Sequence, residues 1–197
     1  SYTNTHVFTQ LFKEPDRFQG DESFAEGLVN RLTILSAAPT IQKDTGSAPI
    51  VRTSVFGGGE IKDHIWNFSG IASPVEMLKQ NTYGVGVTVA TPSISGTPNF
   101  DGTIRSAPLI VSANEQIYPS VALEVLRVFG DHKNYQTRVT PEVGIEWIRM
   151  GRAAPIETTP TADIQIAYWY EFDRISAADL SESDLEGKIL IWGLTAE

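Results

Sequence analysis

The side chains in this sequence best suited to acid–base chemistry or metal binding are three histidines, and they lie far apart. His6, His64 and His132 are the only histidines, and no two of them fall within one helical turn. A metal site or a Ser-His-Asp triad would therefore require the fold to bring distant residues together. The Gly-x-Ser-x-Gly sequence that marks one class of such triads is absent. We therefore predict that the protein is not an enzyme.

Carboxylates are the second group with chemical potential. Asp21 and Glu22 are adjacent, and a later acidic cluster comprises Asp179, Glu182, Asp184 and Glu186. Glycoside hydrolysis needs two carboxyl groups held across a cleft, which neighbours on one loop rarely provide, so a solvated acidic surface is favoured. Because hard cations take oxygen ligands, Asp21 and Glu22 are candidates for a weak Ca²⁺ site, although EF-hand spacing is absent. No other cofactor is expected, and any Ca²⁺ is expected at subunit interfaces.

Two glycine patterns and one asparagine are interpreted structurally. Gly57-Gly-Gly59 and Gly84-Val-Gly86 lack the Lys-Ser/Thr pair or helix-opening third glycine of phosphate-binding loops, so we interpret them as turn or bulge glycines. The alternation over 83–90 places its glycines on one face of a strand, which indicates close backbone approach or a bulge. Asn67 begins a glycosylation sequon but lies between two aromatic residues expected to be buried, so no glycosylation is expected.

Aromatic side chains are the remaining candidates for ligand contact. Aromatic rings suit the apolar faces of sugars, and a lectin-like sandwich could present them as a platform. Packing in the core or between subunits is the favoured alternative. The residues concerned are Trp66, Trp147, Trp169, Trp192, Tyr168 and Tyr170.

Composition excludes several function classes. The 197 residues carry a formal net charge of −9, and the longest basic cluster, 149–152, is too thin to bind a phosphate backbone or an acidic membrane surface. The absence of cysteine excludes disulfides and thiolate metal sites. No apolar run approaches the roughly 20 residues that span a bilayer, and no signal peptide is visible. Because the sequence starts at Ser1, we expect a processed product or a cut fragment.

The element that positions several of these aromatic residues is a strand predicted over 163–172. Ile164, Ile166, Tyr168, Tyr170 and Phe172 recur at every second position and line one face. The opposite face is mostly polar but carries the indole of residue 169. An aromatic residue on this second face indicates a further layer, which a helix, a loop or a neighbouring subunit would supply.

The rest of the chain reads as short strands joined by turns. Strands are predicted over 28–35, 50–56, 83–90, 107–111, 138–140, 143–149 and 188–193, with Pro141 separating the fifth and sixth, and short helices over 21–27, 73–79 and 176–187. The stretch 121–129 fits both a helix face and a strand, and its valines favour a strand. Many turns with few helices predict an all-β fold, an antiparallel β-sandwich of jelly-roll type with one or two short helices. We expect a single domain over 1–197, with 1–49 and 174–197 as extensions.

The closing strand over 161–173, preceded by Pro155 and Pro160, is similar to the last strand of jelly-roll coat proteins of small non-enveloped RNA viruses. The resemblance covers about 50–173, together with the long inter-strand loops and the absence of cysteine. It implies a virion protein assembled in the host cytoplasm. The chain lacks the basic N-terminal arm that many such coats use to bind the genome, so direct nucleic-acid binding is not expected.

Two functional hypotheses follow from these observations. The first is a self-assembling viral coat protein or coat-projection domain, with Trp169, Tyr170 and Trp192 at contacts between like subunits. The alternative is a carbohydrate- or ligand-binding β-sandwich. Expected partners are copies of the chain or other coat subunits, with a host receptor or glycan as a further candidate and no membrane contact.

Overall fold

The largest sheet of the molecule is mainly parallel. In the computed structural model, which describes residues 5–12, 20–42, 53–89, 103–181 and 187–193, the strand order is β14-β1-β2, and β5 and β6 both pair with β2. Only β5 runs antiparallel to its neighbour. The strands are β1 (Thr5–Leu11), β2 (Leu32–Thr40), β5 (Gly70–Ala72), β6 (Gly84–Val87) and β14 (Ile189–Trp192).

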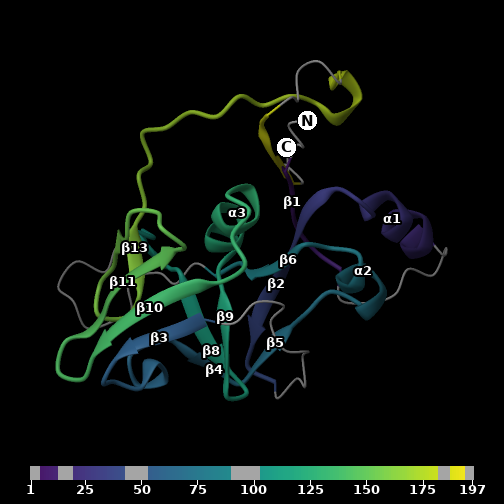
Figure 1. Ribbon diagram of the computed structural model, residues 1–197. Helices are drawn as coiled ribbons and strands as arrows, with labels where there is room; N and C mark the ends of the chain where they lie inside the picture. The colour runs from purple at the N-terminus through teal and green to yellow at the C-terminus, as the bar shows by residue number, and fades with distance from the viewer. Residues whose placement is uncertain (1–4, 13–19, 43–52, 90–102, 182–186, 194–197) are drawn as a thin grey trace.

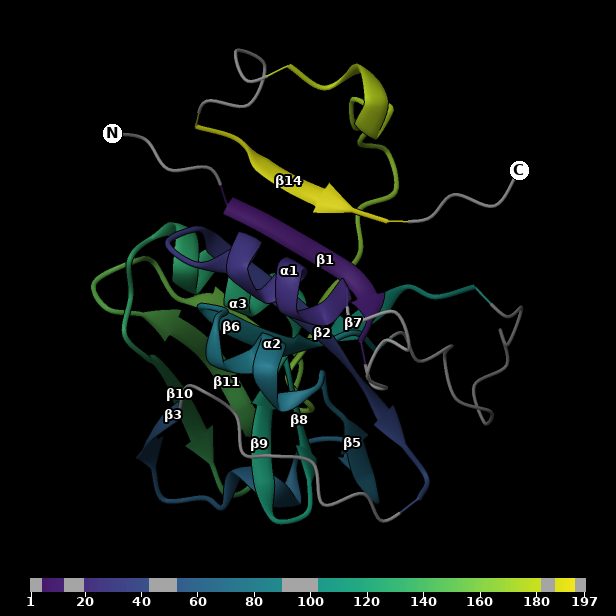
Figure 2. The same cartoon turned by 90° about the vertical axis from the view of Figure 1, so that its right-hand side faces the viewer.

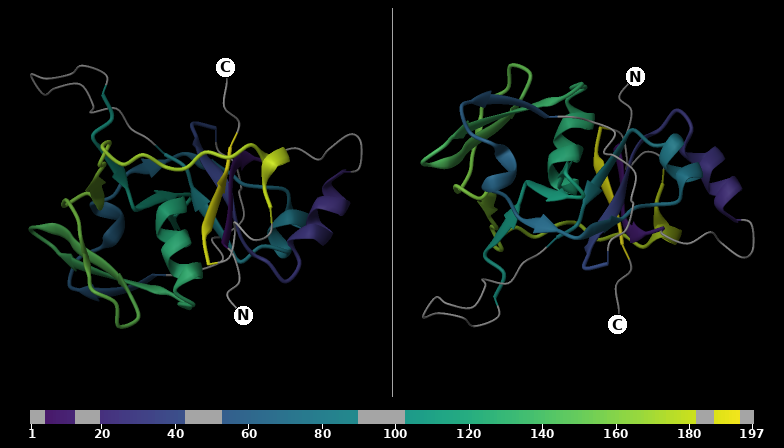
Figure 3. Two further views of the ribbon diagram at one scale, coloured as in Figure 1. Left: turned by 90° about the horizontal axis from the view of Figure 1, so that it is seen from above. Right: turned by 90° about the horizontal axis from the view of Figure 1, so that it is seen from below.

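Helices cover both faces of this sheet, because alternate residues of its central strands are apolar on both sides. Phe8 and Leu35 pack in a cluster with residues of two helices on one face. Val7 and Ile34 point to the opposite face and pack against a third helix. Figures 2 and 3 show the first two helices and the third on opposite sides of β1 and β2. The helices are α1 (Gly20–Leu28), α2 (Glu76–Gln80) and α3 (Val121–Phe129).

The two glycines of β6 allow α3 to lie directly on the sheet. A Cβ atom built on Gly86 would lie 2.4 Å from the Cα of Val121, and one built on Gly84 would lie 2.6 Å from Oε2 of Glu124. No side chain larger than hydrogen fits these distances. The sequence-based expectation of close backbone approach at these glycines is therefore confirmed.

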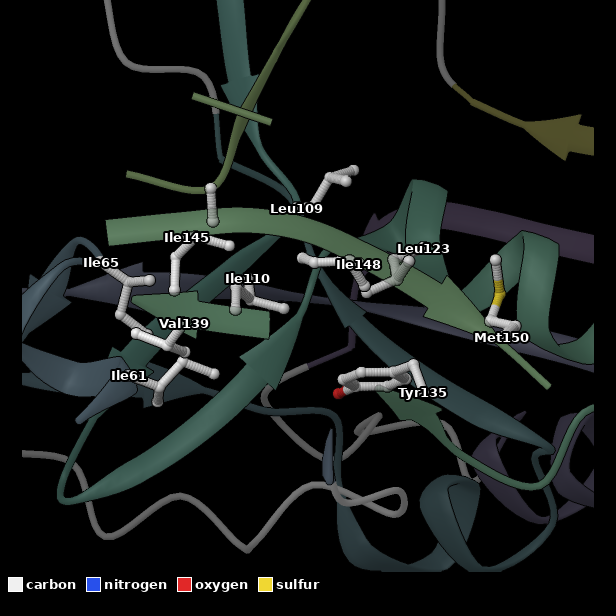
Figure 4. Close-up of a cluster of buried hydrophobic side chains, with 11 residues drawn as sticks. Ile61, Ile65, Leu109, Ile110, Leu123, Tyr135, Val139, Ile145, Ile148 and Met150 are labelled. Atoms are coloured by element: carbon white, nitrogen blue, oxygen red, sulfur yellow. The ribbon is translucent and has the colours of Figure 1, made fainter. Parts of the chain in front are cut away.

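A second sheet, on the other side of α3, encloses the main apolar cluster (Figure 1). Its strand order is β12-β11-β10-β3, and its inner residues, among them Tyr135 and Ile148, pack against Leu123 of α3 and Ile110 (Figure 4). Its strands are β3 (Thr53–Gly57), β10 (Tyr135–Thr140), β11 (Gly144–Met150) and β12 (Ile156–Glu157).

Shorter strands fill the space between the two large sheets. The hairpin of β8 and β9 turns at Asn114 and Glu115, which both have positive φ angles, 47° and 63°, as a tight two-residue hairpin turn requires. The remaining elements are β4 (Asn67–Phe68), β7 (Ser106–Pro108), β8 (Ile110–Ala113), β9 (Gln116–Pro119), β13 (Asp163–Gln165) and the 3₁₀ turns η1 (Ile61–Asp63) and η2 (Ala177–Asp179).

The prediction of a mostly-β chain with few helices is confirmed, whereas the antiparallel jelly-roll sandwich is not. The strands form several mixed sheets, and β1, β2, β6 and β14 pair in parallel. Parallel neighbours require a crossover connection, which α1 supplies between β1 and β2. Segment 1–49, expected as an extension, thus contributes β1, α1 and β2 to the central layer.

Three local predictions are wrong for identifiable reasons. Segment 121–129 is the helix α3, whose start is capped by the Ser120 hydroxyl accepting a 3.2 Å hydrogen bond from the Leu123 amide. The helix predicted to start at Ser73 instead has Val75 as its N-cap. The strand predicted over 163–172 ends at Gln165, because beyond it the described chain provides no neighbouring strand.

The last part of the chain leaves the body and returns to it. Residues 166–181, which we call the arm, run from the end of β13 across the molecule as irregular chain and the short turn η2 (Figure 1). After residues outside the described set, the chain returns as β14, which adds to the edge of the parallel sheet beside β1. The final strand predicted over 188–193 is therefore confirmed as β14.

Candidate functional site

The most organised exposed group of polar and aromatic side chains lies on the outer face of β3, β10 and β11. Alternation along these strands sends one set of residues into the core and the other set outward. The outward set, which we call the outer face, comprises Phe56, Gln136, Arg138, Glu146, Trp147 and Arg149.

A β-bulge concentrates side chains on the outer face. Arg138 pairs with Trp147, but the next residue of β10, Val139, pairs with Ile145, so Glu146 is an extra residue in β11. The bulge therefore interrupts strict alternation between Ile145 and Trp147. Both Arg138 and the Thr140 hydroxyl interact with the Glu146 carboxylate, which places Glu146 on the same side of the sheet as Trp147.

The two arginines of the outer face are oriented through their Nε atoms. Arg149 donates a 2.7 Å hydrogen bond from Nε to Oε1 of Gln136, and Arg138 forms an ion pair in which Nε lies 3.4 Å from Oε2 of Glu146. Among the described residues, neither arginine donates a hydrogen bond from its terminal nitrogens to another side chain or carbonyl. Each guanidinium is thus held through Nε and keeps the four N–H donors of its two terminal nitrogens for a further acceptor.

Trp147 lies at the centre of the outer face and is only partly exposed. The guanidinium carbon of Arg149 lies 5.0 Å from its ring centroid, in a cation–π contact. Because Arg138 is the cross-strand partner of Trp147, and Arg149 is two residues further along β11, the two arginines are diagonal neighbours. Diagonal positions of an antiparallel pair lie about 7–8 Å apart, close enough for one small ligand to meet both side chains.

A second polar cluster lies inside the molecule, on α3. Glu124 and Arg127 are both buried and form an ion pair, with Nε and Nη2 of the arginine each 2.7 Å from Oε2 of the glutamate. The same guanidinium donates hydrogen bonds to the backbone oxygens of Tyr83, at 2.7 Å, and His132, at 3.0 Å. Burial raises the pKa of the Glu124 carboxyl, and the charge of Arg127 opposes that rise. This cluster joins α3 to two loops and offers no exposed surface to a ligand.

A third polar group fastens β13 to the body. The indole Nε1 of Trp66 donates a 3.2 Å hydrogen bond to Oδ1 of Asp163, and the hydroxyls of Thr159 and Thr161 donate to its other oxygen. Asp163 is buried, so these donors replace its water shell. The arrangement is a structural one, since its polar atoms satisfy one another.

The aromatic residues singled out from the sequence do not form one platform. Trp66 is tied to Asp163, Trp147 is on the outer face, and Trp169 and Tyr170 lie on the arm with ring centroids 6.2 Å apart. Trp192 lies on β14, stacked on Phe8 with centroids 5.8 Å apart.

Trp192 also holds β14 to β1 through a polar contact. Its Nε1 donates a 3.3 Å hydrogen bond to Nδ1 of His6. Burial and then the charge of Arg31 lower the pKa of His6, in keeping with an acceptor nitrogen. The structure therefore gives Trp192 a role within the chain, whereas Trp169 and Tyr170 remain exposed.

The candidate metal ligands and the sequon lie at the surface. Asp21 and Glu22 occupy the first turn of α1, where their negative charges interact favourably with the positive end of the helix dipole. Within the described residues, no three His, Asp or Glu side chains come together in a way that could hold a metal ion. Asn67 is exposed at the start of β4, contrary to the burial expected from its aromatic neighbours.

The sequence reading missed the outer face. It treated Arg149 only as part of a thin basic cluster and did not connect it with Arg138. The available signal was the polar alternation of Gln136, Arg138 and Thr140 beside Trp147. Sequence alone could not supply the register that pairs these two segments across the bulge.

Comparison with known proteins overturns the viral reading. A family model described as the CHASE2 domain matches residues 6–197. No curated protein and no solved structure matches the chain. CHASE2 is a sensory extracellular domain of signalling proteins and not a coat-protein family, so the predictions of a viral coat function and a virion location are wrong. Because the match covers nearly the whole sequence, this chain belongs to the CHASE2 domain family.

Proposed function

We propose that this chain is the ligand-binding sensory domain of a signalling protein and that it lies on the extracellular or periplasmic side of the membrane. The family match supports this proposal, and it favours the ligand-binding hypothesis over the coat-protein hypothesis. No helix within the described ranges has the length and apolar character of a membrane-spanning segment.

The ligand class is inferred from the outer face. Arg138 and Arg149 keep their terminal N–H groups available, and the same face also carries the carboxylates of Glu146 and of Glu157, the cross-strand partner of Trp147. Arginine presents N–H donors in a planar fork that matches a carboxylate. The half-exposed ring of Phe56, the cross-strand partner of Arg138, adds an apolar surface beside them. The ligand is therefore a small carboxylate that carries a flat apolar group.

A neutral sugar fits the same surface less well. Sugar stacking requires an open aromatic face, and the guanidinium of Arg149 already lies over the ring of Trp147. The proposed ligand contacts are therefore the terminal N–H groups of the two arginines and not the indole of Trp147.

Titration calorimetry with benzoate and succinate, and with glucose as the neutral comparison, tests this proposal. Arg138→Lys and Arg149→Lys retain the charge but remove the fork, so each should weaken benzoate binding by about ten- to a hundredfold, the value of a hydrogen bond to a charged group. Arg152→Lys, at an exposed turn position after β11, is the matched control and should bind like the wild type. Binding of glucose alone, or carboxylate binding that both outer-face variants leave unchanged, would refute the proposed site.

A further inference from the structure

The arm has few contacts with the body of the protein. At its start, the arm is bonded to the body by a 2.9 Å hydrogen bond from the Ile166 amide to the Arg105 carbonyl and by a hydrogen bond from the Tyr168 hydroxyl to the Ile104 carbonyl. Every residue from 167 to 179 is exposed. Figures 1 and 3 show this stretch running away from β13, separate from the sheets, before the chain returns towards β1.

Despite this exposure, the arm is strongly apolar. The exposed fraction is 79% for both Trp169 and Phe172, and the other large apolar side chains of the stretch are also mostly exposed, namely Tyr168, Tyr170 and Ile175. Five exposed large apolar residues within eight positions are a concentration of the kind that marks an interaction site. Contacts within a single copy of the chain therefore do not explain why these apolar side chains are present in the arm.

The same stretch has the sequence of a strand but lacks a partner strand. Ile164, Ile166, Tyr168, Tyr170 and Phe172 alternate with period two, yet pairing with β7 stops at Gln165. Tyr168 and Trp169 lie in a local turn, and no backbone group from 167 to 175 is bonded to another segment of the described chain. A segment with strand alternation and backbone groups open to other segments is a template for pairing with another strand.

The element beyond the arm is, in contrast, well docked. β14 pairs in parallel with β1 over four residues, from Thr5 opposite Ile189 to Phe8 opposite Trp192. The Thr9 hydroxyl donates a 2.8 Å hydrogen bond to the Trp192 carbonyl, and the Trp192 ring is stacked on Phe8. A docked strand at the end of a poorly anchored connection can make these same contacts on a second copy of the chain.

We propose that this chain forms a two-fold symmetric dimer by strand exchange, in which β14 of each copy pairs with β1 of the other. The two arms then cross and pair antiparallel with each other. A symmetry axis at Tyr170 places Tyr168 of one copy opposite Phe172 of the second copy, on the face that the alternation makes apolar. Self-pairing of this kind is isologous, so it closes at two copies.

Both features of the arm are explained by this assembly. The unpaired strand sequence acquires a partner, and Tyr168, Tyr170 and Phe172 acquire apolar cross-strand neighbours on one face of the paired arms. The proposal uses residues outside the outer face and stands or falls independently of the ligand proposal.

A designed cross-link distinguishes exchange from a closed monomer. The natural chain has no cysteine, and Thr5 and Ile189 are Cα partners across β1 and β14, so a Thr5→Cys/Ile189→Cys variant can be oxidised without competing thiols. Exchange predicts a disulfide-linked dimer on a non-reducing gel and a monomer after reduction. Ile189→Cys alone is the control for random cross-linking and should give no comparable dimer. A disulfide within one chain would overturn the proposal.

Light scattering coupled to size-exclusion chromatography provides a measurement that does not depend on oxidation. The wild type is expected at dimer mass, and the Trp169→Ser/Tyr170→Ser/Phe172→Ser variant should shift towards monomer without loss of its circular dichroism spectrum. Val143→Ser, which replaces an exposed apolar residue elsewhere, should keep the dimer mass. A wild-type monomer at every concentration overturns the proposal. So does a monomer whose arm aromatics bind phosphatidylcholine vesicles, because the arm would then serve a lipid surface.

Discussion

Replacing Arg127 with Met should strongly destabilise the protein, because it leaves the Glu124 carboxylate buried without its partner. Methionine keeps the volume and apolar stem of the side chain but removes the ion pair and the donors to the carbonyls of Tyr83 and His132. Breaking a buried pair on one side costs about 3–5 kcal/mol. The structure supports a value in that range, because Glu124 has 1% of its surface exposed and water cannot replace the guanidinium.

Urea denaturation followed by circular dichroism measures this loss. With a slope of about 2 kcal/mol per molar urea, a loss of about 4 kcal/mol lowers the midpoint by about 2 M. The double variant Glu124→Leu/Arg127→Met removes both charges, so it should be more stable than Arg127→Met. It should remain less stable than the wild type, because the carbonyls of Tyr83 and His132 lose their donor in both variants. The double variant separates the buried charge from simple loss of packing.

The dependence on pH gives an independent check of the same reasoning. Burial raises the pKa of the Glu124 carboxyl above its unfolded value, and loss of Arg127 removes the interaction that opposes this rise. A carboxyl with a raised pKa in the folded state contributes stability at low pH and loses it as the pH rises through that pKa. The deficit of Arg127→Met should therefore be smaller at mildly acidic pH than at alkaline pH.

Two results would refute this account of the ion pair. One is an Arg127→Met variant that loses less than about 1 kcal/mol at neutral pH, which would mean that water or rearrangement satisfies the carboxylate. The other is a double variant no more stable than the single one, which would assign the loss to packing or to the unpaired carbonyls of Tyr83 and His132.

Two further predictions concern two glycine positions and one buried tyrosine. Gly86→Ala should lower the melting temperature sharply or prevent folding, because its Cβ would meet the backbone of Val121. Gly27→Ala lies in a helix and has nothing within 4 Å of the added carbon, so it should stabilise the protein by about 0.5–1 kcal/mol. Thermal denaturation of both variants compares them directly. Tyr135→Phe should change the free energy of unfolding by less than about 1 kcal/mol in urea titration, since within the described residues its buried hydroxyl has no hydrogen-bond partner, and a loss above 2 kcal/mol would reveal a partner for it.

Local patterns in the sequence predicted some features correctly. Gly84 and Gly86 indicated a close approach, and the apolar stretch 188–193 indicated the final strand. Each signal lies within a few consecutive residues, but the segments that these residues contact, α3 for the glycines and β1 for the strand, are distant in the sequence and were not predicted.

Segment 121–129 shows where this reading fails. Its valines fit a strand and a helix face equally, and the valine content favoured the wrong choice. The helix is stabilised by the cap at Ser120, by the glycines of β6 that admit it, and by the buried pair of Glu124 and Arg127. The glycines of β6 and the Tyr83 and His132 carbonyls that accept from Arg127 lie outside the segment, so propensity within the segment could not decide.

The sequence by itself determined the alternation of side chains along the strands, the acidic character of the chain and the absence of cysteine chemistry. Only the tertiary structure decided which strands become neighbours. That choice brings Arg138 and Arg149 together on the outer face and leaves the strand pattern of the arm without a partner beyond Gln165. The physical reason is that a period of two fixes the face of each side chain, whereas the backbone hydrogen bonds that complete a strand must come from another segment.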